Sequence, residues 1–142
     1  MEKNSKSSKR SKSKIIRAKR TMPSRKYVNK IFEWCIRTYG RSKHNRTLPE
    51  IRYRRGYYPY NDPSTIAFYD GDMIFIKKED HKNLYKLANS IIHEYTHYIQ
   101  NPHHYDVLSK YISYKYHPME KEANAVANRD TRKCLREIML DE

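Results

Sequence analysis

Cysteine, acidic residues and long apolar runs are all scarce in this chain of 142 residues. Its two cysteines, Cys35 and Cys134, form no CxxC pair, which argues against a disulfide framework and against a cysteine-based zinc site. No apolar run is long enough to cross a membrane, and the basic N-terminus lacks the apolar segment of a secretion signal. We therefore expect a protein without a membrane partner that is intracellular and cytoplasmic, or packaged in a virion.

The positive charge is concentrated at the N-terminus. The chain holds 30 Lys and Arg against 16 Asp and Glu, a net charge of +14. Residues 1–26 carry 11 Lys and Arg and one Glu, so residues 27–142 are only mildly basic. Residues 1–24 are mostly Lys, Arg and Ser, with almost nothing apolar to bury. We expect a disordered tail there, followed by one folded domain at residues 25–142.

This basic tail has two interpretations. Its Lys and Arg side chains can neutralise phosphates, which predicts nucleic-acid binding through residues 1–26 with a strong salt dependence. The same composition is typical of a solvated tail or a localisation signal. The tail has no aromatic residue, so stacking on single-stranded bases is not indicated.

Two segments favour β-structure. Residues 64–77 contain two apolar runs around Asp70-Gly71-Asp72, and an Asp-Gly pair favours a tight turn, so a hairpin is expected. The two aspartates are the right chemistry for metal ligands, but the turn accounts for them. Residues 48–60 predict an irregular strand. Their alternating Tyr and Arg residues fit RNA binding or, as we favour, the two faces of a strand.

Three segments are typical of helices. Residues 24–40 carry an apolar stripe at helical spacing, with Ser24 as N-cap and Gly40 as the stop. A second helix is expected to open at Asp80 or His81 and to continue to about residue 99. A third should begin near Pro118, a residue suited to the first helical position, and run to about residue 140. Residues 103–117 predict a short helix or an ordered loop.

The second of these helices contains the pattern His93-Glu94-Tyr95-Thr96-His97, or HExxH. Four residues of α-helix turn about 400°, so both histidines project from one face and can bind one metal ion. Glu94 lies about 100° around from His93, where a general base for a metal-activated water is needed. Two ordinary buried histidines are the alternative interpretation.

The last helix offers two carboxylates as a third ligand, Glu120 and Glu122. Catalytic zinc is typically held by three protein ligands, and the fourth position is left to water. The two carboxylates point about 200° apart on a helix, so only one can face the metal. The spacing alone leaves both candidates open.

The sequence EKEAN at residues 120–124 resembles the Glu-x-x-Ala-Asn/Asp motif of the gluzincin metallopeptidases. The order of strand pair, HExxH helix and ExxAN helix over residues 64–127 is similar to that of small ImmA/IrrE-type gluzincins of bacteria and phages. This resemblance covers about half the chain. Val126 stands where that family usually has an aromatic residue, and nothing in the chain resembles a regulatory second domain.

The resemblance implies roles for particular residues. It implies that His93, His97 and Glu120 bind Zn²⁺, and that Asn124 hydrogen-bonds a ligand histidine and orients its ring. It also implies that residues 73–77 are an edge strand that pairs with an extended substrate.

The expected fold is α+β, a minimal zincin-like domain. In it a small antiparallel sheet with a hairpin packs against the HExxH helix and a C-terminal helix that bears the third ligand. The expected function is that of a zinc metalloendopeptidase acting on a protein or peptide substrate, with Glu94 as general base. A second group should stabilise the oxyanion, and five candidates remain open: Tyr105, Tyr111, Tyr114, Tyr116 and His117.

Two further interpretations compete with this one. In the first, the chain is a nucleic-acid-associated or virion structural protein, in which the basic tail carries the function and the metal site is inactive or structural. A combined interpretation is a peptidase that its N-terminus brings to nucleic acid or to a packaged nucleoprotein.

Overall fold

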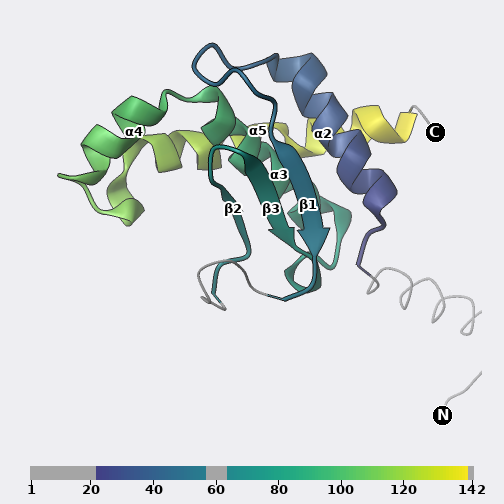
Figure 1. Cartoon of the computed structure of the whole chain (residues 1–142). Helices are drawn as coiled ribbons and strands as arrows, with labels where there is room; N and C mark the ends of the chain where they lie inside the picture. The colour runs from purple at the N-terminus through teal and green to yellow at the C-terminus, as the bar shows by residue number, and fades with distance from the viewer. Residues whose placement is uncertain (1–21, 57–63, 141–142) are drawn as a thin grey trace, which may run out of the picture.

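A computed structural model describes residues 22–56 and 64–140 of the chain. The elements in order are α2 (Arg25–Tyr39), β1 (Glu50–Arg54), β2 (Ala67–Tyr69), β3 (Met73–Lys77), η1 (Lys78–Asp80), α3 (Leu84–Ile99), α4 (Pro102–Ser109), η2 (Tyr114–Tyr116) and α5 (Pro118–Leu140). Figure 1 shows the sheet on one side of α3, with α5 crossing behind it and α4 at one end. The predicted α+β class is confirmed.

Two predictions fall partly or wholly outside the described residues. Residues 1–21 of the basic tail lie there, and so do Tyr57, Tyr58 and Tyr60 of the predicted irregular strand.

The first described helix matches the sequence prediction. α2 follows Ser24 and ends at Gly40, whose φ of 77° lies in the left-handed region that glycine adopts readily. The Ser24 side chain makes no capping hydrogen bond, so this residue caps the helix through its backbone carbonyl alone. The helical spacing buries Val28, Ile31 and Cys35 in the core.

The sheet is mixed, whereas the sequence predicted an antiparallel one. β2 and β3 form the expected antiparallel hairpin, but β1 pairs with β3 in parallel. Ile51 lies opposite Ile74 in this pairing, and the alternation along β1 buries Ile51 and Tyr53. The amphipathic interpretation of residues 48–60 therefore holds for β1.

The strand order β1-β3-β2 shows that the edge-strand prediction for residues 73–77 is wrong. β3 is the central strand, and all five of its residues are buried. The prediction left one side of β3 free. β1, which precedes the hairpin in the sequence, pairs with that side. Within residues 22–56 and 64–140, the outer edges of the sheet belong to β1 and β2 and have no paired strand.

The turn between β2 and β3 accounts for its aspartates, as expected. Oδ1 of Asp70 accepts hydrogen bonds from the backbone N–H groups of Asp72 and Met73, at 3.0 and 2.9 Å. Gly71 has a φ of 100°, which the tight turn requires and which side-chain-bearing residues adopt rarely.

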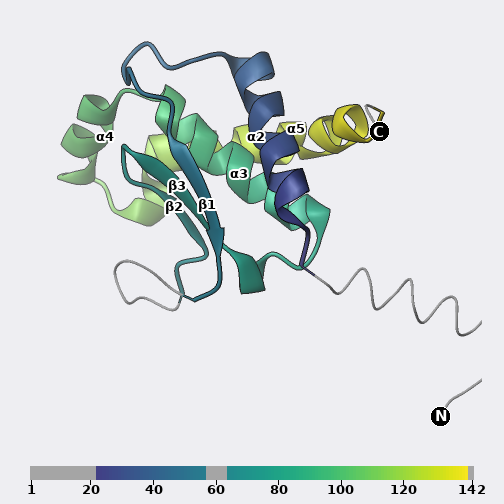
Figure 2. The same cartoon turned by 45° about the vertical axis from the view of Figure 1, so that its right-hand side comes forward.

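α3 is the central helix of the domain. It contacts β2 and β3 on one side and α2 and α5 on others, and Figure 2 shows it running between the sheet and α5. It begins at Leu84, later than predicted, because Asn83 caps it by accepting a hydrogen bond from the backbone N–H of Lys86 at 2.8 Å. Five of its large side chains are fully buried and pack the helix into the core: Leu87, Ile91, Ile92, Tyr95 and Tyr98.

The segment between the two motif helices is ordered, as predicted. It consists of α4, capped by Asn101, and the short turn η2. α5 begins at Pro118, the position expected from the sequence. Within residues 22–56 and 64–140, every helix is too short or too polar to span a bilayer.

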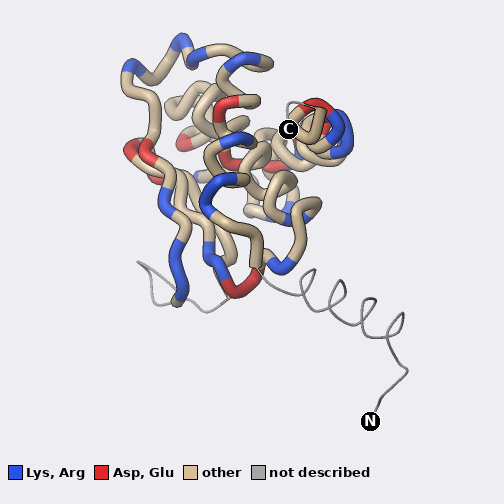
Figure 3. Tube along the Cα trace, turned by 90° about the vertical axis from the view of Figure 1, so that its right-hand side faces the viewer, with Lys and Arg blue, Asp and Glu red and all other residues tan. Residues whose placement is uncertain are grey.

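Charged residues of the folded part are spread over several elements. Figure 3 shows Lys and Arg positions on separate helices, strands and loops, with Asp and Glu positions between them. This distribution agrees with the mild positive charge that the sequence assigns to residues 27–142.

Candidate metal centre

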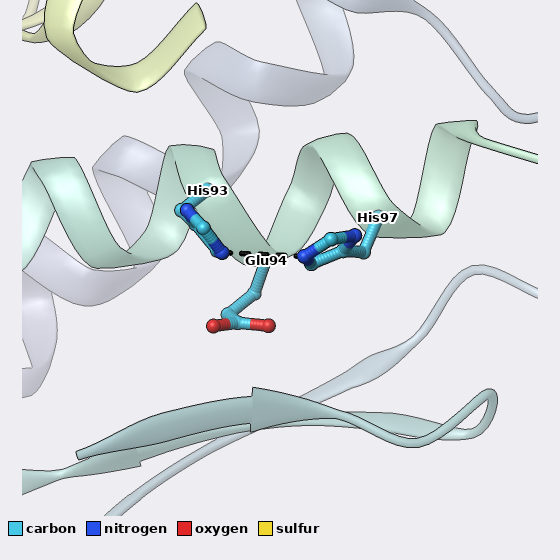
Figure 4. A group of neighbouring side chains, drawn as sticks. All are labelled: His93, Glu94 and His97. Atoms are coloured by element: carbon cyan, nitrogen blue, oxygen red, sulfur yellow. Dashed lines mark hydrogen bonds between the residues drawn. The ribbon is translucent and has the colours of Figure 1, made fainter. Parts of the chain in front are cut away.

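His93 and His97 lie one turn apart on α3 and face each other. Their Nε2 atoms are 3.2 Å apart, and the two side chains are only 14% and 11% exposed. Figure 4 shows the two rings converging while Glu94 extends from the helix toward the strands. One donor atom from each of these three residues lies within 4.8 Å of the others. The HExxH residues are thus brought together as the sequence predicted.

Glu120, in the first turn of α5, reaches both histidines. Its Oε1 lies 3.2 Å from Nε2 of His93, and its Oε2 lies 3.0 Å from Nε2 of His97. Glu122 is exposed and points to a different partner, Gln100. Of the two carboxylates that the sequence left open, the structure brings Glu120 to the histidines.

The spacing of the donor atoms fits a zinc ion. Zinc bonds of about 2.0–2.2 Å in a tetrahedron place neighbouring donor atoms about 3.3–3.6 Å apart. The three distances among the two histidine nitrogens and the Glu120 carboxylate are 3.0 to 3.2 Å, within a few tenths of that range. Two imidazoles and one carboxylate are also a common catalytic zinc set. Both the geometry and the chemistry of these residues therefore suit zinc.

Burial and neighbouring charges set the pKa values at this centre. Burial raises the pKa of Glu94, although His93 and His97 partly oppose it. Burial alone would also raise the pKa of Glu120, but hydrogen bonds from both histidines and from Tyr105 hold it well below its ordinary value. The pKa values of the two carboxyl groups are therefore shifted in opposite directions. The lowered pKa suits Glu120 to be a metal ligand, and the raised pKa suits Glu94 to take up a proton.

His97 is held between carboxylates. Burial alone would lower the pKa of His97, but the hydrogen bond with Glu120 and the charge of Glu94 raise it overall. Protons and a metal ion compete for the same nitrogen in such a site.

Tyr105 and Tyr114 are the two oxyanion candidates that line the pocket beside the histidines. The hydroxyl of Tyr105 donates a hydrogen bond to Oε2 of Glu120. Although 69% of Tyr114 is exposed, desolvation of its hydroxyl together with the charge and hydrogen bonding of Glu120 raises its pKa to about 12, so the hydroxyl stays protonated and can donate.

The other three candidates lie outside the pocket lining. Tyr111 and Tyr116 are 83% and 58% exposed. His117 is buried, stacks on the ring of Tyr105 with centroids 4.1 Å apart, and accepts a hydrogen bond from the backbone N–H of Met119. His117 therefore supports Tyr105 from behind.

The contact predicted for Asn124 is not made. Its side chain is exposed and lines the pocket, and no hydrogen bond joins it to His93 or His97 in the described part of the chain. The residue that contacts Nδ1 of His97 is Gln100, which sequence reasoning missed. Its Oε1 lies 2.7 Å from Nδ1 of His97. The available signal was its place three residues after His97, where the helix ends and a long polar side chain can turn back.

The histidines lie in a pocket of about 960 Å³. β2, the turn that follows it, α3, α4 and the start of α5 all contribute lining residues. This volume is at the upper end of the range of ligand pockets. The candidate metal centre therefore opens into a cleft that the outer edge of β2 borders on one side.

Comparisons of the chain with models of protein families, with curated proteins and with solved structures found no match. The likeness to gluzincins therefore rests on the sequence motifs and on the geometry of this centre.

Proposed function

We propose that this chain is a zinc-dependent metallopeptidase of the gluzincin type that hydrolyses peptide bonds in proteins or peptides. The observation that carries this proposal is the convergence of His93, His97 and Glu120. The two Nε2 atoms lie 3.2 Å apart, and each has one carboxylate oxygen of Glu120 at 3.0 to 3.2 Å. Glu94 stands beside them, buried and with a raised pKa. Three ligands on one side of the ion would leave its other side open to the pocket.

The residues of the centre divide the chemistry among them. Zinc, when bound, supplies Lewis acidity, which acidifies water and polarises a carbonyl group. Glu94 accepts a proton from the attacking water and later gives it to the leaving amine. Tyr114, whose hydroxyl remains protonated, donates a hydrogen bond to the developing oxyanion.

The open edge of β2 suits an extended substrate. Ile66 accepts a hydrogen bond from the N–H of Lys77 at 2.9 Å, and Asp70 donates one to the carbonyl of Met73 at 3.2 Å. Because alternate residues of an antiparallel strand bond to the same neighbour, Ala67 and Tyr69 turn their backbone groups away from β3. Both residues line the pocket, so a peptide that adds to this edge would pass the histidines.

Metal analysis of the purified protein, paired with Glu94→Gln, tests the proposal. The protein should contain close to one equivalent of zinc, and the variant should keep the zinc but lose cleavage of a peptide library. Glu33→Gln makes the same change at an exposed position of α2 and should leave both unchanged. A folded protein that takes up no zinc, or full cleavage by Glu94→Gln, contradicts the proposal.

The concentration of charge in residues 1–26 favours a second role, binding to nucleic acid. In the combined proposal this segment delivers the peptidase to a nucleoprotein. Removing residues 1–21 keeps Pro23 and Ser24, whose carbonyl groups bond to Tyr53 and to the first turn of α2. It should abolish salt-sensitive retention on nucleic acid while zinc content and peptidase activity persist. If the truncated protein keeps its retention on nucleic acid, the charged segment is not responsible for it.

A further inference from the structure

Gln100 occupies the point where α3 ends and the chain turns away. Its backbone N–H donates to the carbonyl oxygens of Thr96 and His97, at 3.0 and 3.2 Å, while its own φ and ψ of −70° and 161° are extended. Its side chain is buried, with 8% of the residue exposed. It lies between the last turn of α3 and the first turn of α5, so each of its polar atoms needs a partner.

The orientation of the Gln100 amide is determined by two acceptors. Its Nε2 lies 2.9 Å from the carbonyl oxygen of Met119 and 2.7 Å from Oε1 of Glu122. Both amide hydrogens are used in these bonds. Turning the amide over would place its oxygen against the same two acceptors, so Oε1 must face His97.

The position of this oxygen determines the tautomer of His97. An amide oxygen only accepts hydrogen bonds, and it lies 2.7 Å from Nδ1 of His97, so Nδ1 carries the hydrogen. In the neutral ring with hydrogen on Nδ1, Nε2 is the nitrogen whose lone pair a metal ion would bind, whereas in the protonated ring Nε2 donates to Glu120. We propose that Glu122 and Gln100 are positioning residues, and that Glu122, Gln100 and His97 form a relay that fixes the metal-binding tautomer and ring orientation of His97.

The negative charge of Glu122 strengthens the relay. A carboxylate that accepts from the amide N–H polarises the amide, so Oε1 becomes a better acceptor for the imidazole N–H. Contacts of this kind raise the basicity of a ligand histidine, and here an amide stands between the carboxylate and the ring.

The relay also couples two ligands from different helices. Met119 and Glu122 lie on either side of Glu120 in the first turn of α5, and both bind the side chain that holds His97 on α3. A displacement of either helix end would therefore move both ligands. This inference rests on the proposed function in one respect, the identity of the metal ion that Nε2 of His97 binds.

The tautomer can be read by long-range ¹H–¹⁵N NMR of metal-free Glu120→Ala protein labelled in histidine, at alkaline pH where the rings are neutral. This substitution removes the carboxylate that lies 3.0 Å from Nε2 of His97 and competes with Gln100 for the ring hydrogen. The relay requires hydrogen on Nδ1 of His97. Hydrogen on Nε2 of His97 in the Glu120→Ala protein overturns the inference. His93 is an internal control, because its Nδ1 has no hydrogen-bond partner in the part of the chain that the structure describes.

Gln100→Met keeps the length of the side chain and removes all three hydrogen bonds. We expect a mixture of His97 tautomers when it is combined with Glu120→Ala, and zinc affinity lower by about 10- to 100-fold when it is made alone, measured by competition with a chromophoric chelator. Glu122→Gln keeps an acceptor and removes only the charge, so its loss of affinity should be smaller. Glu33→Gln is the matched control and should bind zinc as the wild type does.

The outcomes separate this inference from the proposed function. The relay is overturned if the Nδ1–H tautomer persists when Gln100→Met is combined with Glu120→Ala and Gln100→Met alone binds zinc within twofold of the wild type. Wild-type protein that binds no zinc, together with loss of the Nδ1–H tautomer when Gln100→Met is added to Glu120→Ala, contradicts the metallopeptidase proposal and supports the relay. If circular dichroism shows that Gln100→Met is unfolded, the tautomer of Glu120→Ala protein and the affinity of Glu122→Gln decide.

Discussion

The Nε2 atoms of His93 and His97 lie 3.2 Å apart on α3, and Glu120 meets them both from another helix, 27 positions after His93. Two donors are therefore local to one helical turn, whereas the third depends on how α5 packs against α3. The three side chains therefore meet only when α5 packs against α3.

Glu120→Gln is expected to reduce zinc affinity more than Glu122→Gln does. The first change removes the charge of a carboxylate whose oxygens lie 3.2 and 3.0 Å from the histidine nitrogens. Its cost should exceed the roughly 10- to 100-fold that changes to surrounding contacts produce. Competition titrations on both variants measure the difference. Equal losses would show that Glu120 is not the third ligand.

The two pocket tyrosines should have different effects when their hydroxyls are removed. Tyr105 donates to Glu120, so Tyr105→Phe should weaken zinc binding about tenfold. Tyr114→Phe should lower kcat roughly 100-fold, as expected for a donor to the oxyanion, and should weaken zinc binding less than Tyr105→Phe does. Tyr111→Phe alters a side chain that is 83% exposed and serves as the control. The reverse pattern would exchange the roles of Tyr105 and Tyr114.

Ala67→Pro tests the substrate edge. It removes an N–H group that points away from β3, and proline is tolerated at such positions of edge strands. We expect KM for peptide substrates to rise while zinc content and thermal stability stay close to those of the wild type. Ala67→Val enlarges the side chain but keeps the N–H group, and should change KM less. An unchanged KM in the proline variant would exclude this edge as the peptide-binding strand.

Tyr39→Phe is expected to make the free energy of unfolding less dependent on pH in the acidic range. The Tyr39 hydroxyl donates to Oδ2 of Asp130 at 2.7 Å, a bond between α2 and α5 whose loss should cost about 1.5–3 kcal/mol at neutral pH. Hydrogen bonds from Arg129 and then from Tyr39 hold the pKa of Asp130 below its ordinary value of 3.8.

The direction of this pH dependence follows from the lowered pKa. Because Asp130 has a lower pKa in the folded than in the unfolded chain, its stabilisation is complete above pH 3.8 and is lost as pH falls through the folded-state pKa. Urea unfolding of the wild type and of Tyr39→Phe across this range should show that the difference between their free energies of unfolding becomes smaller as the pH falls. A difference that stays constant with pH would mean that the Tyr39 hydroxyl does not stabilise the fold through the charged carboxylate of Asp130.

Local features of the chain could be predicted because neighbouring residues determine them. The four-residue spacing of His93 and His97 needs only the geometry of one helix. Pro118 opens α5, and the Asp-Gly pair forms the turn between β2 and β3, because each residue limits its own backbone.

Features that depend on distant contacts could not be predicted in the same way. β1 pairs directly with β3 although β2 comes between them in the sequence, and nothing in the hairpin itself shows that Ile51 will pair with Ile74. The role of Gln100 depends on Met119 and Glu122, which meet it only when α3 and α5 pack together. A motif describes ligands, but the partners that orient them come from tertiary structure.

α3 carries its buried apolar residues and its two histidines on different parts of its surface. Ile91, Ile92 and Tyr95 are fully buried, whereas His93 and His97 border the pocket. Exchanging the histidines for residues of similar size would therefore leave the hydrophobic core of the domain intact. Chains that descend from a common ancestor with this fold could lose the reaction and keep the architecture. Shape alone would then be a poor guide to activity among such relatives, and the identities at positions 93, 94, 97 and 120 would be the diagnostic feature.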